Sequence, residues 1–163
     1  MSGARIKRIE EYLEGDTFIV AYGNRLSTID VNRLLTFHQQ QNKIGTITGV
    51  RAPERYSKAV TEERSITEFI QYQTSTHYYI NGGIYVFNRK LLDYLSDDEM
   101  CTLEQTPLER LIQDNELSLY VYDGFWQHID SEREAEQLRN NAHVLGFPRQ
   151  AKRRTWPKLV IQG

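Results

Sequence analysis

The run Thr17-Phe18-Ile19-Val20-Ala21-Tyr22, which ends at Gly23, constrains the fold of this chain more than any other segment. It is short, apolar and rich in β-branched side chains, which is typical of a strand covered on both faces. A helix follows, with Asp30 as its candidate N-cap, and residues 44–50 favour a second strand. The apolar face of this helix is formed by Val31, Leu34, Leu35 and His38. A strand, a crossover helix and a strand in this order favour a parallel sheet.

Three later segments also favour strands. Residues 65–72 and 117–122 have the required apolar and β-branched side chains. Residues 78–87 contain Gly82-Gly83, so we expect a bulge or a close backbone approach within that strand. The polar stretch around Pro53 indicates a loop.

Helices are predicted at three further places. Ile6, Ile9 and Leu13 recur at helical spacing, and Gly15 is a stop signal. Capping boxes at Thr106–Glu109 and Ser131–Glu134 predict two more helix starts. The alternation predicts a single α/β domain over residues 1–148. Residues 149–163 are expected to form a solvated basic tail, with its cations at Arg149, Lys152, Arg153, Arg154 and Lys158.

Charge and composition exclude several classes of protein. The 20 Lys and Arg residues nearly balance 22 Asp and Glu residues, which argues against nucleic acid as a partner. No apolar run approaches the roughly 18 residues of a membrane span, and no signal peptide is recognisable, so we expect a cytoplasmic protein without membrane contacts. Cys101 is the single cysteine, which excludes an internal disulfide and a C-x-x-C metal site.

Generic catalytic motifs are missing from the sequence. There is no G-x-G-x-x-G, Walker A, G-x-S-x-G or H-E-x-x-H segment. The histidines show no metal-ligand spacing, so we interpret each as a surface or core residue. They are His38, His77, His128 and His143.

Five short segments together carry a more specific signal. They are Gly3–Ile9, Tyr22–Leu26 with Asp30-Val31, Ile80–Val86, Glu104 with Pro107-Leu108, and Gly124–Asp130. In order and spacing they resemble the G-G-R-I-K-R-I, Y-G-D-G-V, I-N-G-G-F-F-V, E-x-x-P-L and G-F-W-Q-P-M-D segments of sugar-1-phosphate nucleotidyltransferases, most closely the glucose-1-phosphate cytidylyltransferases. The resemblance implies a partial doubly wound, Rossmann-like mixed sheet with flanking helices, of the nucleotide-diphospho-sugar transferase type.

The resemblance also implies a reaction and a set of site residues. A sugar-1-phosphate oxygen attacks the α-phosphorus of CTP, and Mg²⁺, cations and a glycine-rich loop neutralise the phosphates. Asp130 is the implied metal ligand, and the implied sugar contacts are Asn81, Gly82, Gly83, Glu104 and Trp126. Simpler interpretations stay open, because Asn-Gly-Gly is common in turns, Trp126 could belong to the core and Asp130 could cap a helix. Tyr22 and Tyr85 are interpreted as core residues.

The sequence departs from the family pattern at positions that bear charge. Asn24 replaces the metal-binding aspartate of Y-G-D-G, Gln71 replaces a glutamate, and Tyr72 replaces the lysine that pairs with the sugar phosphate. Met1 stands just before the first matching segment, so we expect the glycine-rich loop to be missing and CTP not to bind. The expected Mg²⁺ site is therefore weakened.

Three hypotheses for function follow. The first is a truncated, degenerate member or pseudoenzyme that retains at most weak sugar-1-phosphate binding. The second is the active half of a split sugar nucleotidyltransferase. The third is a homo-oligomeric interaction module, because a partial sheet exposes strand edges. The residues leave the nucleobase preference open.

Overall fold

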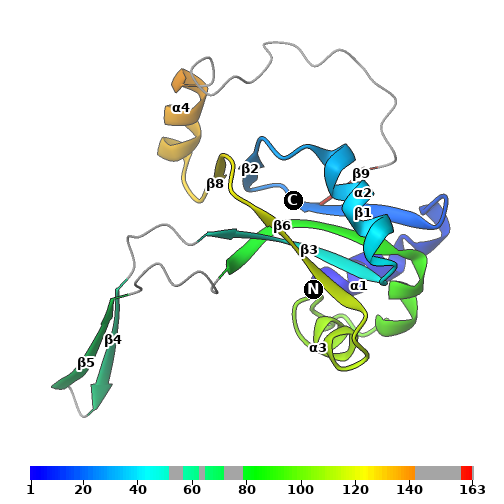
Figure 1. Cartoon of the computed structure of the whole chain (residues 1–163), viewed down its shortest axis with the longest axis horizontal. Coiled ribbons are helices and arrows are strands. Elements are labelled where there is room, and N and C mark those ends of the chain that lie inside the picture. Colours follow the sequence, from blue (N-terminus) through cyan, green and yellow to red (C-terminus); the bar gives the residue numbers. More distant parts are fainter. Residues whose placement is uncertain (52–56, 63–64, 72–78, 142–158, 163) are drawn as a thin grey trace.

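The helices and strands alternate along the chain as the sequence predicts (Figure 1). The computed structural model describes residues 1–51, 57–62, 65–71, 79–141 and 159–162. The α-helices are α1 (Ser2–Arg8), α2 (Val31–Gln41), α3 (Thr106–Gln113) and α4 (Glu132–Asn141), and the 3-10 helices are η1 (Glu10–Tyr12) and η2 (Arg89–Tyr94). The strands are β1 (Thr17–Tyr22), β2 (Arg25–Ser27), β3 (Gly45–Arg51), β4 (Ser57–Glu62), β5 (Ser65–Gln71), β6 (Tyr79–Asn88), β7 (Leu117–Tyr122), β8 (Trp126–His128) and β9 (Leu159–Gln162).

The main sheet is mixed, with the strand order β7-β3-β6-β1-β9. Strand β6 is antiparallel to both β1 and β3, whereas β3–β7 and β1–β9 are parallel pairs. The mixed α/β sheet is confirmed, and the strands around α2, β1 and β3, run parallel to each other, although they are not neighbours in the sheet. The chain inserts β6 between β1 and β3, and β6 supplies the hydrogen bonds that each would otherwise give to the other.

Strand β6 divides the core into two layers. Tyr85 and Phe87 are fully buried and face α1, η2 and α3, while the intervening Val86 faces α2 and contacts Leu34 and Ile19. This alternation is the two-residue period of a strand covered on both faces. Tyr85 is thus a core residue as predicted. Tyr22 is half-buried and packs edge-on against Tyr85, with 5.7 Å between ring centroids.

Helix α2 confirms the signals that predicted it. The Asp30 carboxylate accepts hydrogen bonds from Asn32 N at 2.9 Å and Arg33 N at 3.2 Å, so it is the N-cap. His38, on the predicted apolar face, is 4% exposed, and its Nδ1 lies 2.8 Å from Thr46 Oγ1. Burial lowers the pKa of His38 from its ordinary value.

The two capping boxes have different outcomes. The Ser131–Glu134 box forms: Ser131 Oγ accepts from Glu134 N at 3.3 Å, and Glu134 Oε2 accepts from Ser131 N at 3.1 Å. The Thr106 box is wrong, because Thr106 lies inside α3 and Gln105 occupies the N-cap without a side-chain hydrogen bond. Pro107 nevertheless lies in the first turn, where its missing N–H costs no hydrogen bond.

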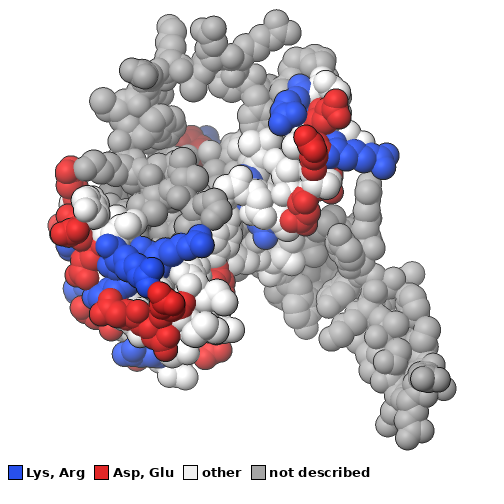
Figure 2. Space-filling view, turned by 180° about the vertical axis from the view of Figure 1, so that it is seen from behind, with Lys and Arg blue, Asp and Glu red and all other residues white. Residues whose placement is uncertain are grey.

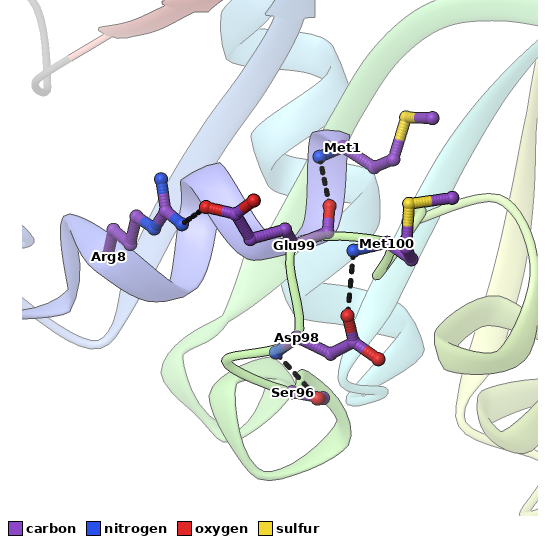
Figure 3. A network of polar contacts seen from close by, with 6 residues as sticks. All are labelled: Met1, Arg8, Ser96, Asp98, Glu99 and Met100. Carbon is purple, nitrogen blue, oxygen red and sulfur yellow. Dashed lines mark hydrogen bonds and ion pairs between the residues drawn. The ribbon is translucent and has the colours of Figure 1, made fainter.

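Helix α1 is anchored to the loop that follows η2. The Met1 backbone nitrogen donates to Glu99 O at 2.5 Å, and the Arg8 guanidinium pairs with the Glu99 carboxylate at 2.8 Å. Asp98 shapes the same loop by accepting from Met100 N at 2.9 Å (Figure 3). The exposed ion pair contributes little, so the buried Ile6 provides most of the contact energy.

Two segments differ from the sequence expectation in part. The strand predicted at residues 65–72 is present as β5, and it pairs antiparallel with β4 as a separate two-stranded sheet, which the sequence did not indicate. Within the tail expected at residues 149–163, residues 159–162 form β9, which pairs in parallel with β1. Pro53, the basic residues of the tail, His77 and His143 lie outside the described residues.

Acidic and basic side chains are interspersed on the face shown in Figure 2. This distribution agrees with the net charge of −2. None of the helices in the described part of the chain has the length and apolar character needed to cross a bilayer.

The buried His38 predicts a pH dependence of stability. The folded state holds the pKa of His38 below its value in the unfolded chain, so the unfolded state binds more protons below about pH 6.5. The wild-type free energy of unfolding should therefore fall faster between pH 7.5 and 5.5 than that of His38→Gln. Urea unfolding of both proteins at several pH values measures the difference, and identical slopes would contradict the prediction.

Candidate functional site

The candidate site is built where β2 pairs with β8. Arg25 lies opposite His128, and Ser27 lies opposite Trp126, in an antiparallel register. Beyond the strands, Ile129 N donates to Asn24 O at 2.9 Å. This pairing brings the segments Tyr22–Leu26 and Gly124–Asp130, about one hundred residues apart in sequence, to one place.

Asn24 and Asp130 meet through His128. The His128 Nε2 atom lies 2.9 Å from Asn24 Nδ2 and 2.6 Å from Asp130 Oδ1. A proton on Nε2 donates to the Asp130 carboxylate, and the Asn24 amide can share that proton only when its oxygen faces the ring. The Asp130 side chain therefore belongs to this cluster, and Ser131 caps α4 in its place.

The donor set of this cluster fits Mg²⁺ poorly. Mg²⁺ requires near-octahedral oxygen ligands and is usually held through carboxylates. Here the cluster supplies one carboxylate, which His128 already engages, together with an amide and an imidazole nitrogen. Within the described residues, no group of three or more His, Cys, Asp or Glu side chains could hold a metal ion.

The residues predicted to contact a sugar converge beside this cluster. Trp126 Nε1 donates to Gly82 O at 2.8 Å, which fixes the indole against the Asn-Gly-Gly segment. Asn81 Oδ1 accepts from Gly83 N at 2.9 Å, a local bond that closes a tight bend inside β6. Asn81, Gly82, Gly83 and Trp126 are therefore neighbours, although they come from two sheets.

Glu104 is connected to the same group through Tyr85. The Tyr85 hydroxyl donates to Glu104 Oε1 at 3.3 Å and accepts a short hydrogen bond from Asn81 Nδ2. Burial raises the pKa of Tyr85, while the Asn81 hydrogen bond and the nearby Arg25 charge oppose that rise. The phenol stays neutral and can transmit a hydrogen bond from Asn81 to the carboxylate.

The two glycines of this segment are required for different reasons. A Cβ at Gly82 would lie 2.6 Å from Thr48 Oγ1, where β3 and β6 change register. Gly83 has φ +74°, and a Cβ there would lie 2.7 Å from Arg25 Cγ. The predicted close approach within this strand is thus confirmed, and the approaching groups are protein side chains. A role for these glycines in sugar binding stays a prediction.

Sequence reasoning missed two residues of the site. Arg25 takes the place of the second glycine in Y-G-D-G, and its guanidinium carbon lies 5.7 Å from the centre of the Trp126 ring. His128 takes the place of proline in G-F-W-Q-P-M-D and was interpreted as surface or core. Both signals were present as departures from the motifs. Tyr72 lies outside the described residues, and Gln71 is described only by its backbone in β5.

A cleft of about 280 Å³ lies between η2 and α3. Its lining includes Tyr94, Cys101 and Arg110. It contains no residue of the cluster around His128 or of the group that joins Asn81, Tyr85, Glu104 and Trp126. Arg110 lies over the Tyr94 ring at 5.0 Å from its centre.

The mixed sheet with helices on both faces, and a polar cluster beside its glycine-containing central strand, agrees with the Rossmann-like fold that the motifs implied. The sequence profile described as "Nucleotidyl transferase" matches residues 3–130. The chain therefore belongs to the nucleotidyl transferase family. This confirms the resemblance stated from the motifs.

Individual relatives show which nucleotidyl transferases this chain is similar to. The chain is 31% identical over 159 residues to the glucose-1-phosphate cytidylyltransferase of Salmonella typhi, covering 96% of this chain and 59% of that protein. It is 32% identical over 131 residues to the "Probable glucose-1-phosphate cytidylyltransferase" of Bacillus subtilis, covering 80% of this chain and 51% of that protein. The crystal structure of HddC from Yersinia pseudotuberculosis superposes with a TM-score of 0.58 at 18% identity, covering 86% and 62%. The chain thus spans between half and two thirds of these proteins.

Gly83 and Gly15 form a matched pair for testing how the site is packed. Both have positive φ, but a Cβ at Gly15 would meet nothing within 4 Å. Gly15→Ala should destabilise the protein by about 1 kcal/mol through backbone strain alone. Gly83→Ala should cost roughly 1–3 kcal/mol more, because it also displaces Arg25 and Tyr22. Urea unfolding measures both values, and equal losses would contradict this packing.

Proposed function

We propose that this chain binds a sugar 1-phosphate and that, by itself, it does not transfer a nucleotidyl group. Membership of the nucleotidyl transferase family supports the substrate class, since two relatives of this chain carry the name glucose-1-phosphate cytidylyltransferase. The proposed lack of nucleotidyl transfer rests on one observation: His128 is in contact with both Asp130 and Asn24 at the expected metal site.

The contact between His128 and Asp130 limits catalysis because the reaction needs its negative charge to be neutralised. Nucleotidyl transfer brings two polyanions together and redistributes negative charge over the transferring phosphoryl oxygens. Losing one charge-assisted contact costs about 1.5–3 kcal/mol, and each 1.4 kcal/mol is a tenfold change in rate. With one carboxylate already paired, the cluster gathers a divalent cation weakly. Magnesium, where bound, is held mainly by substrate phosphates.

The proposed sugar binding rests on the group of polar and aromatic side chains beside Gly82. Asn81 and Glu104 supply hydrogen-bonding groups joined through Tyr85, and Trp126 presents an indole fixed by its bond to Gly82. Sugar rings pair with such a combination of amide, carboxylate and aromatic face. Binding is expected to be weak, because both Asn81 and Glu104 already have protein partners.

A turnover assay tests the proposal directly. With CTP, glucose 1-phosphate and Mg²⁺, pyrophosphate release by this chain should stay below about one per second, the low end of typical enzyme turnover. The Salmonella typhi relative, assayed alongside, serves as the positive control. Turnover above that rate would refute the inactivity, and no heat of binding with millimolar glucose 1-phosphate would refute the sugar-binding half.

A second carboxylate in the cluster of Asn24, His128 and Asp130 should strengthen metal binding. Asn24→Asp places a second carboxylate beside His128 and Asp130, so affinity for Mn²⁺ should rise by roughly tenfold, the value of one charge-assisted contact. Asn32→Asp, which adds the same charge at an exposed position of α2, is the control and should not change it. Electron paramagnetic resonance of free Mn²⁺ measures both affinities. An unchanged affinity in Asn24→Asp would show that a carboxylate is not what the cluster needs.

A further inference from the structure

Arg25 is held between Gly83 of β6 and Trp126 of β8. Its aliphatic stem lies against Gly83, where an added Cβ would lie 2.7 Å from Cγ and 3.3 Å from Nε. Its guanidinium lies over the Trp126 indole, at 5.7 Å from the ring centre. Both contacts orient the group, and neither satisfies its N–H donors.

The guanidinium contains buried donors without partners. Arg25 Nε and Nη1 are shielded from solvent and have no hydrogen-bond partner in the described part of the protein. Arginine remains charged at all accessible pH values, and buried polar groups in native proteins are nearly always hydrogen-bonded. Leaving two shielded guanidinium donors without partners is costly, which favours an anion beside this half-buried side chain.

The carboxylates of the site are engaged elsewhere. Asp130 pairs with His128 at 2.6 Å, and Glu104 accepts hydrogen bonds from Tyr85 and Ser2. Neither neutralises Arg25 in this structure. Among the described residues, the carboxylates of the site are thus already engaged, which favours a ligand as the source of an anion.

We infer that Arg25 anchors the phosphate group of a phosphorylated sugar, with the sugar ring toward Asn81 and the Trp126 indole. A guanidinium is the side chain best matched to phosphate oxygens, because its planar donors form charge-assisted hydrogen bonds. The inference rests on the proposed sugar-1-phosphate binding and adds the residue that selects for the phosphate. A bound phosphate would give the Arg25 guanidinium a charged partner, which it lacks among the described residues.

Calorimetric titrations of the full chain with glucose 1-phosphate, glucose and inorganic phosphate test the inference. The wild-type protein should prefer glucose 1-phosphate over glucose, and Arg25→Gln should lose that preference by at least about tenfold, as expected for one charge-assisted contact. Arg25→Lys keeps the charge and should retain part of it. Arg110→Gln is the matched control, since Arg110 also lies over an aromatic ring, and it should leave binding unchanged.

Thermal unfolding of each variant establishes that it is folded. Because the Arg25 donors are unpaired, Arg25→Gln should unfold cooperatively, and Arg25→Lys provides a second folded variant. Phosphate should raise the melting temperature of the wild type more than that of Arg25→Gln, since a ligand stabilises the state that binds it.

The outcomes separate this inference from the proposed function. Equal binding of glucose 1-phosphate by wild type and Arg25→Gln would overturn the role of Arg25 and leave the sugar-1-phosphate proposal intact. Arg25-dependent binding of inorganic phosphate without any preference for the sugar ester would support the anion anchor and refute the sugar proposal. A wild type that binds neither phosphate compound would overturn both.

Discussion

The hydrogen bonding of β6 on both edges is the constraint on which the rest of the structure depends. Its antiparallel partners, β1 and β3, satisfy its backbone groups, and its alternating side chains fill both layers of the core. A strand covered on both faces and paired on both edges cannot shift register without exposing its apolar residues. The first half of the same strand contains Asn81, Gly82 and Gly83, so the rigidity of the core fixes the position of the candidate sugar site.

The site is completed by a second, much shorter pairing. Strands β2 and β8 contain three residues each, and their register places Arg25 opposite His128. Such a small ribbon is marginal alone; the Trp126–Gly82 hydrogen bond ties it to β6. Core stability and site geometry are thus linked through one indole. The polar groups of the site differ: the Asp130 carboxylate has His128 as its partner, whereas Arg25 Nε and Nη1 have no hydrogen-bond partner among the described residues.

Local signals predicted local structure well. Asp30 caps α2, Ser131 and Glu134 form their capping box, and Tyr85 is buried, because each depends on neighbours within a few residues or on burial itself. The Thr106 box failed although its pattern was equally good, since the loop before α3 places Gln105 at the cap. Motif resemblance identified the family and brought Asn81, Gly82, Gly83, Trp126 and Asp130 to notice. It did not indicate that His128 would stand between Asn24 and Asp130.

The sequence by itself determined the α/β class, most strand and helix positions and the family, because hydrophobic period, capping chemistry and motif order are properties of the chain. Only the tertiary structure decided which strands are neighbours: β6 separates β1 from β3, and β9 joins the edge that β1 would otherwise expose. It also decided that Nε and Nη1 of the half-buried Arg25 are shielded from solvent and have no hydrogen-bond partner among the described residues. Whether a charged side chain finds a counter-ion depends on groups from distant segments, and no local pattern encodes which of them arrive.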